Sequence, residues 1–337
     1  MGNMSPPSSP PSSPSGSPSG SPSNSQPSSP SGSPSTDHHT EPRTTPPAIQ
    51  IQHLVKNFGT VTAVDDLSLT VDQGSIHGFL GPNGSGKSTT IRTLIGVLTP
   101  TSGAVEVLGK NPVKHPSVLK RVGYVPGDAA LWPNLTGREV FRALESLRGT
   151  PTNRDREEEL INAFELDPDK KVREYSTGNR RKVGLIAAFA PEPELLILDE
   201  PTAGLDPLME NVFIREVRRF RDQGGSVLLS SHILSEVESL CDHVTVIKEG
   251  RSVASNETSY LRRISAHKIS ATLGSVPPDL SGLPDVVFHD GHLSLTTDAG
   301  SVPAILAAII DAGGEDIIST PAPLEEIFLR HYGEDAT

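Results

Sequence analysis

Cysteine is nearly missing from this sequence of 337 residues, since Cys241 is the only one. A single cysteine excludes an intrachain disulfide and a zinc site built from several thiolates. Such usage fits a reducing compartment. The first residues also lack the basic start and the apolar stretch of a secretory signal, so we expect the protein to remain inside the cell.

Long apolar runs and an excess of basic charge are missing as well. The longest apolar stretches, at 185–190 and 302–310, are shorter than the roughly 20 residues that span a bilayer. We therefore expect no direct membrane insertion, and any membrane role requires a partner. With 41 acidic and 29 basic residues, the formal charge of -12 argues against general nucleic-acid binding.

The first 47 residues lack what a hydrophobic core needs. From residue 5 to residue 35 they are serine, proline and glycine with two amides, without a charge or an aromatic ring. Burial cannot offset the entropy of ordering such a segment, which predicts a disordered tail over 1–47. The tail is either a tether and phosphorylation platform or simply solvated chain.

From residue 48 the composition changes to a pattern typical of an α/β protein. The runs 49–58 and 61–71 predict two antiparallel strands joined at Gly59. The run 75–80 predicts a strand that leads directly into a glycine-rich loop, and the apolar runs 195–200 and 225–232 end in polar residues, as buried parallel strands do. Helical spacing follows at 89–98, and a helical block of roughly 128–190 begins with a capping box formed by Thr136 and Glu139.

After about residue 265 the pattern restarts as a small unit. Three strands with a hairpin turn at Asp290-Gly291, a helix, a strand and a further helix predict a βββαβα order. We expect an accessory α+β domain over 265–332, ferredoxin-like in topology, and a short tail over 333–337. The main domain is then 48–264.

One motif carries a specific chemical signal. The segment GPNGSGKST follows a predicted strand and opens a predicted helix, which is the setting of a P-loop. Its glycines let backbone N–H groups face a phosphate, Lys87 bridges the β- and γ-phosphates of ATP, and Ser88 offers its hydroxyl to Mg²⁺. The predicted nucleotide-binding residues of this loop are Gly81, Pro82, Asn83, Gly84, Ser85, Gly86, Lys87, Ser88 and Thr89.

Polar side chains at the ends of two further strands predict the rest of the site. Asp199 and Glu200 end one apolar strand and His232 follows another, at the carboxyl edge where ligands of such sheets bind. We expect Asp199 to hold Mg²⁺ through its water shell, Glu200 to orient or deprotonate the attacking water, and His232 to contact the γ-phosphate. Lys87, Glu200 and His232 are thus the candidate catalytic residues.

A second loop, YSTGN at 175–179, also resembles a phosphate site, although one nucleotide does not need two such loops in one subunit. The ordered set GPNGSGKST, YSTGN, LLILDEPTAGLDP and SSHILSEVESLCD closely resembles the ATP-binding subunits of ABC transporters over about 48–255. The resemblance implies the P-loop NTPase fold of ABC ATPases and a head-to-tail dimer with a second such subunit, itself or a related chain. Ser176 and Gly178 would then cover the γ-phosphate held by the partner.

Several other assignments follow from the resemblance. Asp206 matches the loop at the dimer seam, with a simple turn beside Pro207 as the alternative. Phe58 falls where the family stacks an aromatic ring on adenine, with a core ring as the alternative. The three basic residues of 180–182 are interpreted as helix surface.

The sequence departs from the family at two places. Thr177 and Asn179 replace the usual glycine and glutamine of the second loop, which could weaken closure because a Cβ crowds the backbone. Gly127 stands where the family has a glutamine that touches Mg²⁺ and the attacking water. Asp128 either supplies the missing oxygen or caps a turn, and Trp132 either meets the membrane partner or belongs to the helical core.

The resemblance extends weakly to the C-terminus, where 324–333 is similar to ATPases that drive drug, lipid or polymer exporters. The leading hypothesis is an ATP-hydrolysing subunit at the cytoplasmic side of the membrane, bound to a polytopic permease. One alternative is a soluble ABC ATPase acting on ribosomes or DNA, although such proteins carry two cassettes or a long coiled coil. Another is a regulatory module with weak or no turnover, against which the intact Lys87, Asp199, Glu200 and His232 argue.

Overall fold

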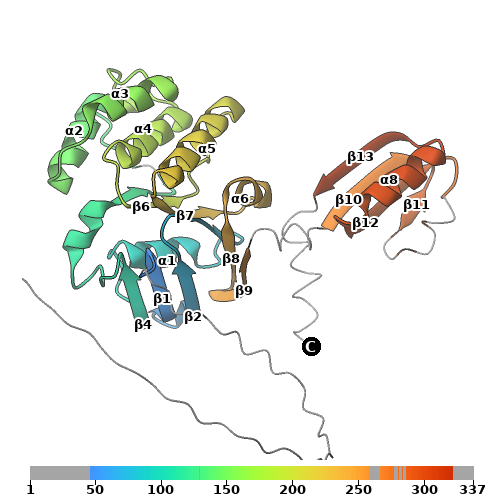
Figure 1. Ribbon diagram of the computed structural model, residues 1–337, viewed down its shortest axis with the longest axis horizontal. Helices are drawn as coiled ribbons and strands as arrows, with labels where there is room; N and C mark the ends of the chain where they lie inside the picture. The colour runs from blue at the N-terminus through green and yellow to red at the C-terminus, as the bar shows by residue number, and fades with distance from the viewer. Residues whose placement is uncertain are drawn as a thin grey trace, which may run out of the picture. The chain divides into compact units, whose positions relative to one another are not determined.

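A computed structural model describes residues 46–128, 130–257, 266–276, 280, 283 and 286–321 (Figure 1). The tail expected over 1–47 lies outside the described residues apart from its last two. The expected boundary near 264, the segment 324–333 and the final tail at 333–337 lie outside them as well.

A six-stranded sheet in the order β5-β6-β7-β3-β8-β9 forms the centre of the protein. The strands from β5 to β8 run parallel, and β9 pairs antiparallel with β8 at one edge. Their bounds are Ile76–Leu80 (β3), Val122–Val125 (β5), Leu195–Asp199 (β6), Ser226–Ser231 (β7), His243–Lys248 (β8) and Arg251–Glu257 (β9). Every residue of β3, β6 and β7 is buried, as expected for strands covered on both faces.

The two faces of this sheet belong to two different hydrophobic cores. In β6, Leu196 and Leu198 pack with the helices of one core, whereas Leu195 and Ile197 pack with α1 and a second sheet. The alternation follows from the period of two of a strand. Figure 1 shows the result: α4 and α5 lie on one side of the sheet, and β1, β2 and β4 lie on the other.

The second sheet is antiparallel and has the order β2-β1-β4. Its strands are Ile49–Phe58 (β1), Val61–Val71 (β2) and Ser102–Val107 (β4). The predicted turn is confirmed, because Gly59 has a φ of 59° and joins β1 to β2. Strands β4, β5, β8 and β9 lie outside the elements expected from the sequence pattern.

Helices fill the connections between the strands. They span Lys87–Leu94 (α1), Gly137–Arg148 (α2), Arg154–Ala163 (α3), Thr177–Phe189 (α4), Pro207–Asp222 (α5) and Leu234–Leu240 (α6), with short 3-10 helices at Pro116–Arg121 (η1) and Val172–Glu174 (η2). The predicted capping box is confirmed: the Thr136 hydroxyl accepts from the Glu139 N–H, and the Glu139 carboxylate accepts from the Thr136 N–H. The helical block begins at 137 rather than 128, since the described residues of 128–136 are not helical.

A separate four-stranded antiparallel sheet, in the order β11-β12-β10-β13, forms the C-terminal unit. Its elements are Ala266–Thr272 (β10), Val287–His289 (β11), His292–Asp298 (β12), Val302–Asp311 (α8) and Glu315–Pro321 (β13). Ile269, Leu293 and Ile309 belong to its own hydrophobic core. The predicted hairpin turn is present, with φ of 48° at Asp290 and 80° at Gly291, and the expected last helix lies outside the described residues.

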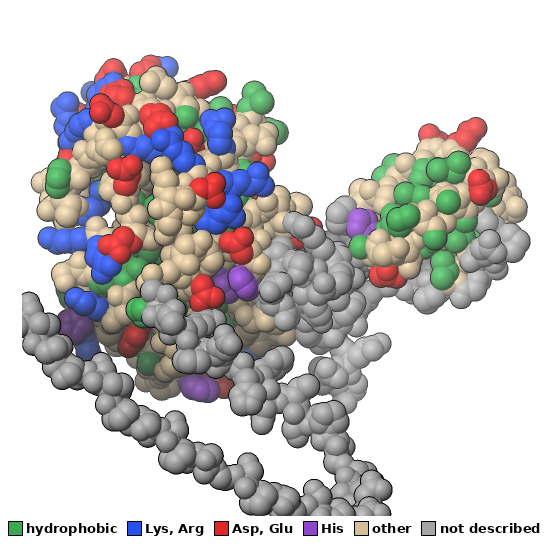
Figure 2. Space-filling model, in the orientation of Figure 1, with side chains coloured by type: hydrophobic (Ala, Val, Ile, Leu, Met, Phe, Trp, Pro, Cys, Tyr) green, Lys and Arg blue, Asp and Glu red, His purple; other side chains and the backbone are tan. Residues whose placement is uncertain are grey.

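None of the helices in the described ranges is long and apolar enough to cross a membrane. On the face shown in Figure 2, Lys and Arg side chains alternate with Asp and Glu side chains over the α2–α5 region. No single sign of charge dominates that face.

Candidate nucleotide-binding site

The predicted P-loop connects the buried strand β3 to helix α1. Gly84 and Gly86 have φ of 82° and 110°, a region that glycine adopts without steric penalty. A Cβ at Gly81 would lie 2.3 Å from the carbonyl oxygen of Ile247, so only glycine fits there. The loop therefore wraps tightly and leads into the first N–H groups of α1, which have no acceptor within the helix.

The turn between β8 and β9 supports this loop from behind. The Gly250 N–H donates to the Ser85 carbonyl at 2.9 Å, and the Gly250 carbonyl accepts from the Asp65 N–H at 2.9 Å. These bonds tie the P-loop to β2 of the second sheet. The Ser85 hydroxyl is buried and has no hydrogen-bond partner in the described part of the chain, so one polar atom of the loop is left unsatisfied.

Lys87 places a buried cation at this loop. Its ammonium donates to the carbonyl oxygens of Gly81 at 2.8 Å and Pro82 at 3.1 Å, and it lies 3.7 Å from Oε1 of Glu200. Burial lowers the pKa of Lys87, while the nearby Glu200 and Asp199 act in the opposite direction. A cation beside open backbone N–H groups is the donor set that binds a phosphate.

The carboxylates predicted at the end of β6 are held by Ser230 of the neighbouring strand. The Ser230 hydroxyl donates to Oδ1 of buried Asp199 at 2.5 Å. The Glu200 N–H points back to Ser230, at 3.2 Å from its carbonyl oxygen and 3.1 Å from its hydroxyl. Glu200 has a φ of 46°, a conformation uncommon for a residue with a side chain and often found at functional sites.

His232 completes a cluster around Glu200. It follows β7, and its Nδ1 lies 3.4 Å from the same Oε1 that approaches Lys87. Glu236 of α6 fixes the two loops that carry these groups, because it accepts hydrogen bonds from the hydroxyls of Ser231 and Thr202. The structure thus brings Lys87, Asp199, Glu200 and His232 to one edge of the sheet.

Three other predicted site residues, Ser88, Phe58 and Asp128, do not belong to the cluster around Glu200. Ser88 is half-buried in the first turn of α1. The Phe58 ring is 47% exposed at the end of β1, which is not the core position considered as an alternative, and the Lys56 ammonium lies 5.0 Å from its centroid. Asp128 is exposed, whereas Gly127 lies against Asp199: a Cβ at Gly127 would be 3.2 Å from Oδ2.

The residues predicted to face a partner subunit lie on exposed surface. Ser176 caps α4 by accepting from the Asn179 N–H, and Asp206 caps α5 by accepting from two N–H groups. A Cβ at Gly178 would lie 2.5 Å from the carbonyl oxygen of Gly204. This close contact packs the second loop against the segment that leads to Asp206, and glycine is required there.

The interpretation of 180–182 as helix surface is wrong for two of its three residues. Arg181 and Lys182 are buried, and Arg181 donates to the backbone carbonyls of Pro126 and Gly127 in one segment and of Ala203 in another. Ser230 and Glu236 also contribute to the site without having been predicted. The serines beside His232 were a possible signal for Ser230, but a run of basic residues at the head of a helix gave no sign of burial.

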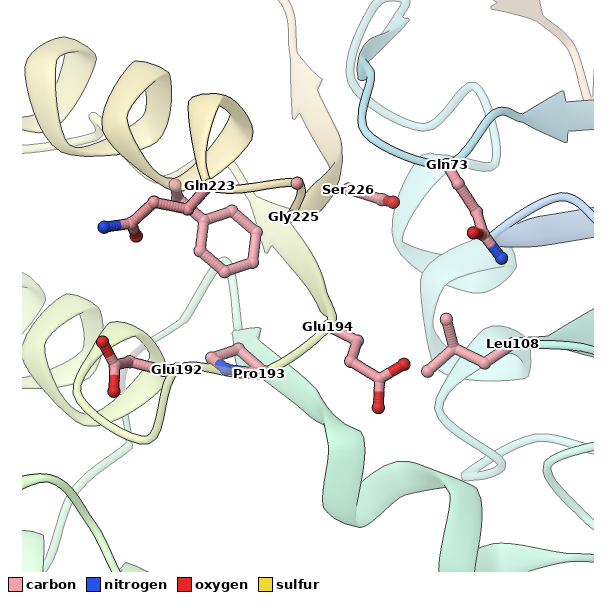
Figure 3. A pocket seen from close by; sticks show the side chains of 10 residues that line it. Gln73, Leu108, Glu192, Pro193, Glu194, Gln223, Gly225 and Ser226 are labelled. Atoms are coloured by element: carbon pink, nitrogen blue, oxygen red, sulfur yellow. The ribbon is translucent and has the colours of Figure 1, made fainter. Parts of the chain in front are cut away.

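The described surface also has hollows that lie away from the P-loop. A groove of about 560 Å³ is lined mainly by apolar side chains between the β5 region and the helices α2 and α4, and its lining includes the 45% exposed Trp132 and the half-buried Arg148. A cavity of about 330 Å³ at the amino ends of β6 and β7 is lined by Glu194, Gln223 and Ser226 among others (Figure 3). It is at the opposite edge of the sheet from Glu200 and takes no part in the candidate site.

Comparisons of sequence and structure with known proteins point to the same family. A family model described as ABC transporter matches residues 64–203. A bacitracin transport ATP-binding protein of Bacillus licheniformis is 38% identical over 64% of this chain and 71% of its own. A daunorubicin resistance ATP-binding protein of Streptomyces coeruleorubidus is 35% identical over 86% and 96%. The solved structure of an ATP-binding subunit of an ABC transporter superposes with a TM-score of 0.61 at 30% identity, over 64% of this chain and 92% of that one.

Proposed function

We propose that this chain, which belongs to the ATP-binding subunits of ABC transporters, binds Mg-ATP between two copies of itself and passes the resulting closure to a membrane permease. As a member of this family it binds and hydrolyses ATP to power an exporter. The observation that carries the detailed proposal is the convergence of Lys87, Asp199, Glu200 and His232 beside the P-loop.

The P-loop residues 81–89 bind the phosphates of ATP through backbone N–H groups. In the nucleotide-bound state the Lys87 ammonium exchanges the carbonyls of Gly81 and Pro82 for β- and γ-phosphate oxygens. The Ser85 hydroxyl, buried and without a partner among the described residues, lies in the same loop. Phe58 offers a half-exposed ring face to the adenine.

Mg²⁺ fits the side chains at the front of this loop. A hydroxyl at Ser88 and a carboxylate at Asp199 are the hard oxygen donors that Mg²⁺ prefers, with phosphate oxygens and water as its other ligands. Within the described ranges no three His, Cys, Asp or Glu side chains gather into a metal site. Binding of Mg²⁺ therefore relies on phosphate oxygens and water in addition to the protein donors. The ion would neutralise charge on the phosphate oxygens, and Asp128 is an additional oxygen donor at the loop edge.

Glu200 acts on the attacking water and His232 on the γ-phosphate. The Glu200 carboxylate lies at the carboxyl edge of the sheet and is held beside Lys87 and His232. From that place it orients the water and accepts its proton, a role that contributes about 10²- to 10⁴-fold in rate. The His232 ring donates an N–H to a negatively charged γ-phosphate oxygen and holds the transferred group in place beside Glu200.

A second copy explains why one chain has two phosphate-facing loops. Ser176 and Gly178 lie at the exposed head of α4, next to the segment that leads to Asp206. In a head-to-tail dimer this surface covers the γ-phosphate bound by the partner, and Asp206 lies at the seam. Each nucleotide then contacts both subunits, so that ATP binding favours the closed dimer.

The apolar groove beside α2 is the docking surface that we propose for the permease. Trp132 and Leu147 expose apolar surface there, and exposed apolar patches rimmed by polar residues favour a protein partner. Relatives named for bacitracin transport and daunorubicin resistance support a drug-type export substrate and a position at the cytoplasmic side of the membrane.

Light scattering on Glu200→Gln protein tests the central part of this proposal. The substitution keeps the size of the side chain and removes the proposed base, so ATP should persist and trap a closed dimer. We expect a dimer in Mg-ATP, a monomer in Mg-ADP and a loss of ATPase activity of about 10²- to 10⁴-fold.

Glu192→Gln is the matched control, because Glu192 precedes β6 and has a similar φ of 50°. It accepts from the Asn153 amide, remote from the proposed base. This control should keep wild-type turnover and should not accumulate a dimer. A Glu200→Gln protein that hydrolyses ATP at the wild-type rate would overturn the assignment of the base. A monomer in Mg-ATP at all protein concentrations would overturn closure between two copies.

A further inference from the structure

Arg181 makes contacts that no role in nucleotide binding requires. It lies five residues after Ser176 on α4 and is buried. Its Nη1 donates to the Pro126 carbonyl and its Nη2 to the Gly127 carbonyl, both at 2.5 Å. Its Nε lies 3.4 Å from the carbonyl oxygen of Ala203. One guanidinium therefore joins the loop after β5, the loop after Glu200 and the helix α4 that Ser176 caps.

The loop after β5 relies on the contact with Arg181, because it has no side chain at Gly127 that could hold the loop beside Asp199. Gly127 has no side chain, and a Cβ there would lie 3.2 Å from Oδ2 of Asp199, the proposed Mg²⁺ ligand. The next residue, Asp128, is exposed. The backbone at 126–127 is thus held beside the metal-binding carboxylate by donors that come from α4.

The chemistry of arginine suits this position better than that of lysine. The guanidinium is planar and presents parallel N–H groups in a fixed fork, so it can serve two successive carbonyls at once. Burial lowers the pKa of Arg181, and the surrounding Asp199, Glu200 and Asp128 offset that effect. The buried cation is therefore compensated by the carboxylates of the site that it supports.

We propose that Arg181 is a positioning residue that couples the two ATP sites of the dimer. It links α4, whose head faces the nucleotide of the partner subunit, to the 126–128 loop, which lies at the metal side of the nucleotide bound by the same subunit. The inference rests on the proposed function, because it requires the head of α4 to contact the partner's ATP. When that contact moves α4, the guanidinium moves the 126–128 loop relative to Asp199.

Arg156 supplies a control for the simpler possibility that Arg181 only stabilises the fold. It is also a buried arginine of the helical block, and it is paired with Glu216 and Glu159. None of these partners belongs to the candidate site. Arg156→Lys should lower stability without moving the 126–128 loop.

Trp132 provides a direct reporter of that loop. It is the only tryptophan of the chain and lies five residues after Gly127, with its ring 45% exposed. Its emission should shift when Mg-ATP closes the site. The spectrum can be recorded on the full-length protein with ATP, with ADP and without nucleotide, independently of turnover.

The experiment compares wild type, Arg181→Lys, Arg181→Gln and Arg156→Lys in four measurements: binding of a fluorescent ATP analogue, kcat and KM for ATP, the Trp132 response and thermal unfolding. For Arg181→Lys we expect kcat to fall about 10- to 100-fold, as for other partners that orient a metal ligand. KM and analogue binding should stay within about threefold, and the Trp132 response to Mg-ATP should be lost. Arg181→Gln keeps a single amide donor and carries the test if the lysine variant does not fold.

Arg156→Lys should lose thermal stability while it keeps kcat and the Trp132 response. Three results would overturn the inference: a wild-type Trp132 response in both Arg181 variants, an unchanged kcat in both, or the same losses in Arg156→Lys. Failure of the proposed function is distinguishable, because wild-type protein would then neither bind the analogue nor hydrolyse ATP.

Discussion

Replacing Ser230 with alanine separates the stability of the central sheet from the alignment of its catalytic edge. Ser230 is fully buried, and its hydroxyl donates to Asp199. Alanine leaves that carboxylate oxygen without a hydrogen-bond partner among the residues that the structure describes. A hydrogen bond to a charged group contributes about 1.5–3 kcal/mol, so the free energy of unfolding should fall by that amount. For a domain of this size the melting temperature should fall by about 3–12 °C.

Activity should fall as well, because Asp199 loses the bond that orients it and the Glu200 N–H loses one of its two acceptors. Loss of such an orienting partner typically reduces activity or metal affinity about 10- to 100-fold. The assays are urea unfolding and steady-state ATPase activity over a range of Mg²⁺ concentrations. We expect the Mg²⁺ concentration needed for half-maximal activity to rise.

Ser226→Ala is the matched control, since Ser226 is a buried serine at the other end of the same strand. Its hydroxyl accepts from the Gly74 N–H, a neutral bond that contributes about 0.5–1.5 kcal/mol. This variant should lose stability and keep its turnover and Mg²⁺ dependence. Equal losses of activity in both variants, or full activity in Ser230→Ala, would refute the assignment of Asp199 to the metal.

Three further predictions follow from other contacts. Gly178→Ala places a Cβ 2.5 Å from the Gly204 carbonyl oxygen, so the free energy of unfolding should fall by about 1–3 kcal/mol. Light scattering should also show a weaker ATP-dependent dimer, and an undiminished dimer would contradict the close packing. Trp132→Ala should reduce the amount of polytopic membrane protein that co-purifies, whereas Trp132→Phe should restore most of it; equal recovery with alanine would exclude the groove. Burial, and to a smaller extent His243, lowers the pKa of His77 from 6.5 to about 3. The unfolded state therefore binds the proton at a higher pH than the folded state does. The free energy of unfolding should fall as the pH drops from 6.5 towards 3, by up to about 1.4 kcal/mol per pH unit. In urea unfolding, the free energy of unfolding of His77→Asn should depend less steeply on pH than that of the wild type. An unchanged slope would mean that a group other than His77 takes up the proton.

Much of the site could be predicted because its residues stand where a strand ends. Lys87 follows β3 through the glycine loop, Glu200 follows β6, and His232 follows β7. Parallel neighbouring strands bring their carboxyl ends to one edge, so apolar run length and the next polar residue suffice to place these groups. The same local logic predicts the caps at Thr136 and the hairpin at Asp290-Gly291.

The remaining contacts depend on pairs that are distant in sequence and lack a local pattern. Arg181 lies 54 residues from Gly127 and 22 from Ala203. Three consecutive basic residues on a helix are usually solvated, and only the carbonyls and carboxylates supplied by other elements reverse that preference. Positive φ at Glu200 is equally invisible in the pattern, because glutamate rarely adopts it. The support of the site, rather than its reacting groups, is what sequence periodicity leaves open.

The geometry of α4 explains why that support would matter in a working dimer. From Ser176 to Arg181 the helix advances about 7.5 Å, at about 1.5 Å per residue, and such a short helical segment moves as a rigid body. A displacement imposed on Ser176 by the partner's nucleotide therefore reaches Arg181 almost undiminished. Since the guanidinium is 2.5 Å from the Gly127 carbonyl, a shift of about 1 Å must either carry the loop along or break the bond. In both cases Asp199 would acquire a different neighbour, and this is how the proposed coupling would let occupancy of one site change the alignment of the other.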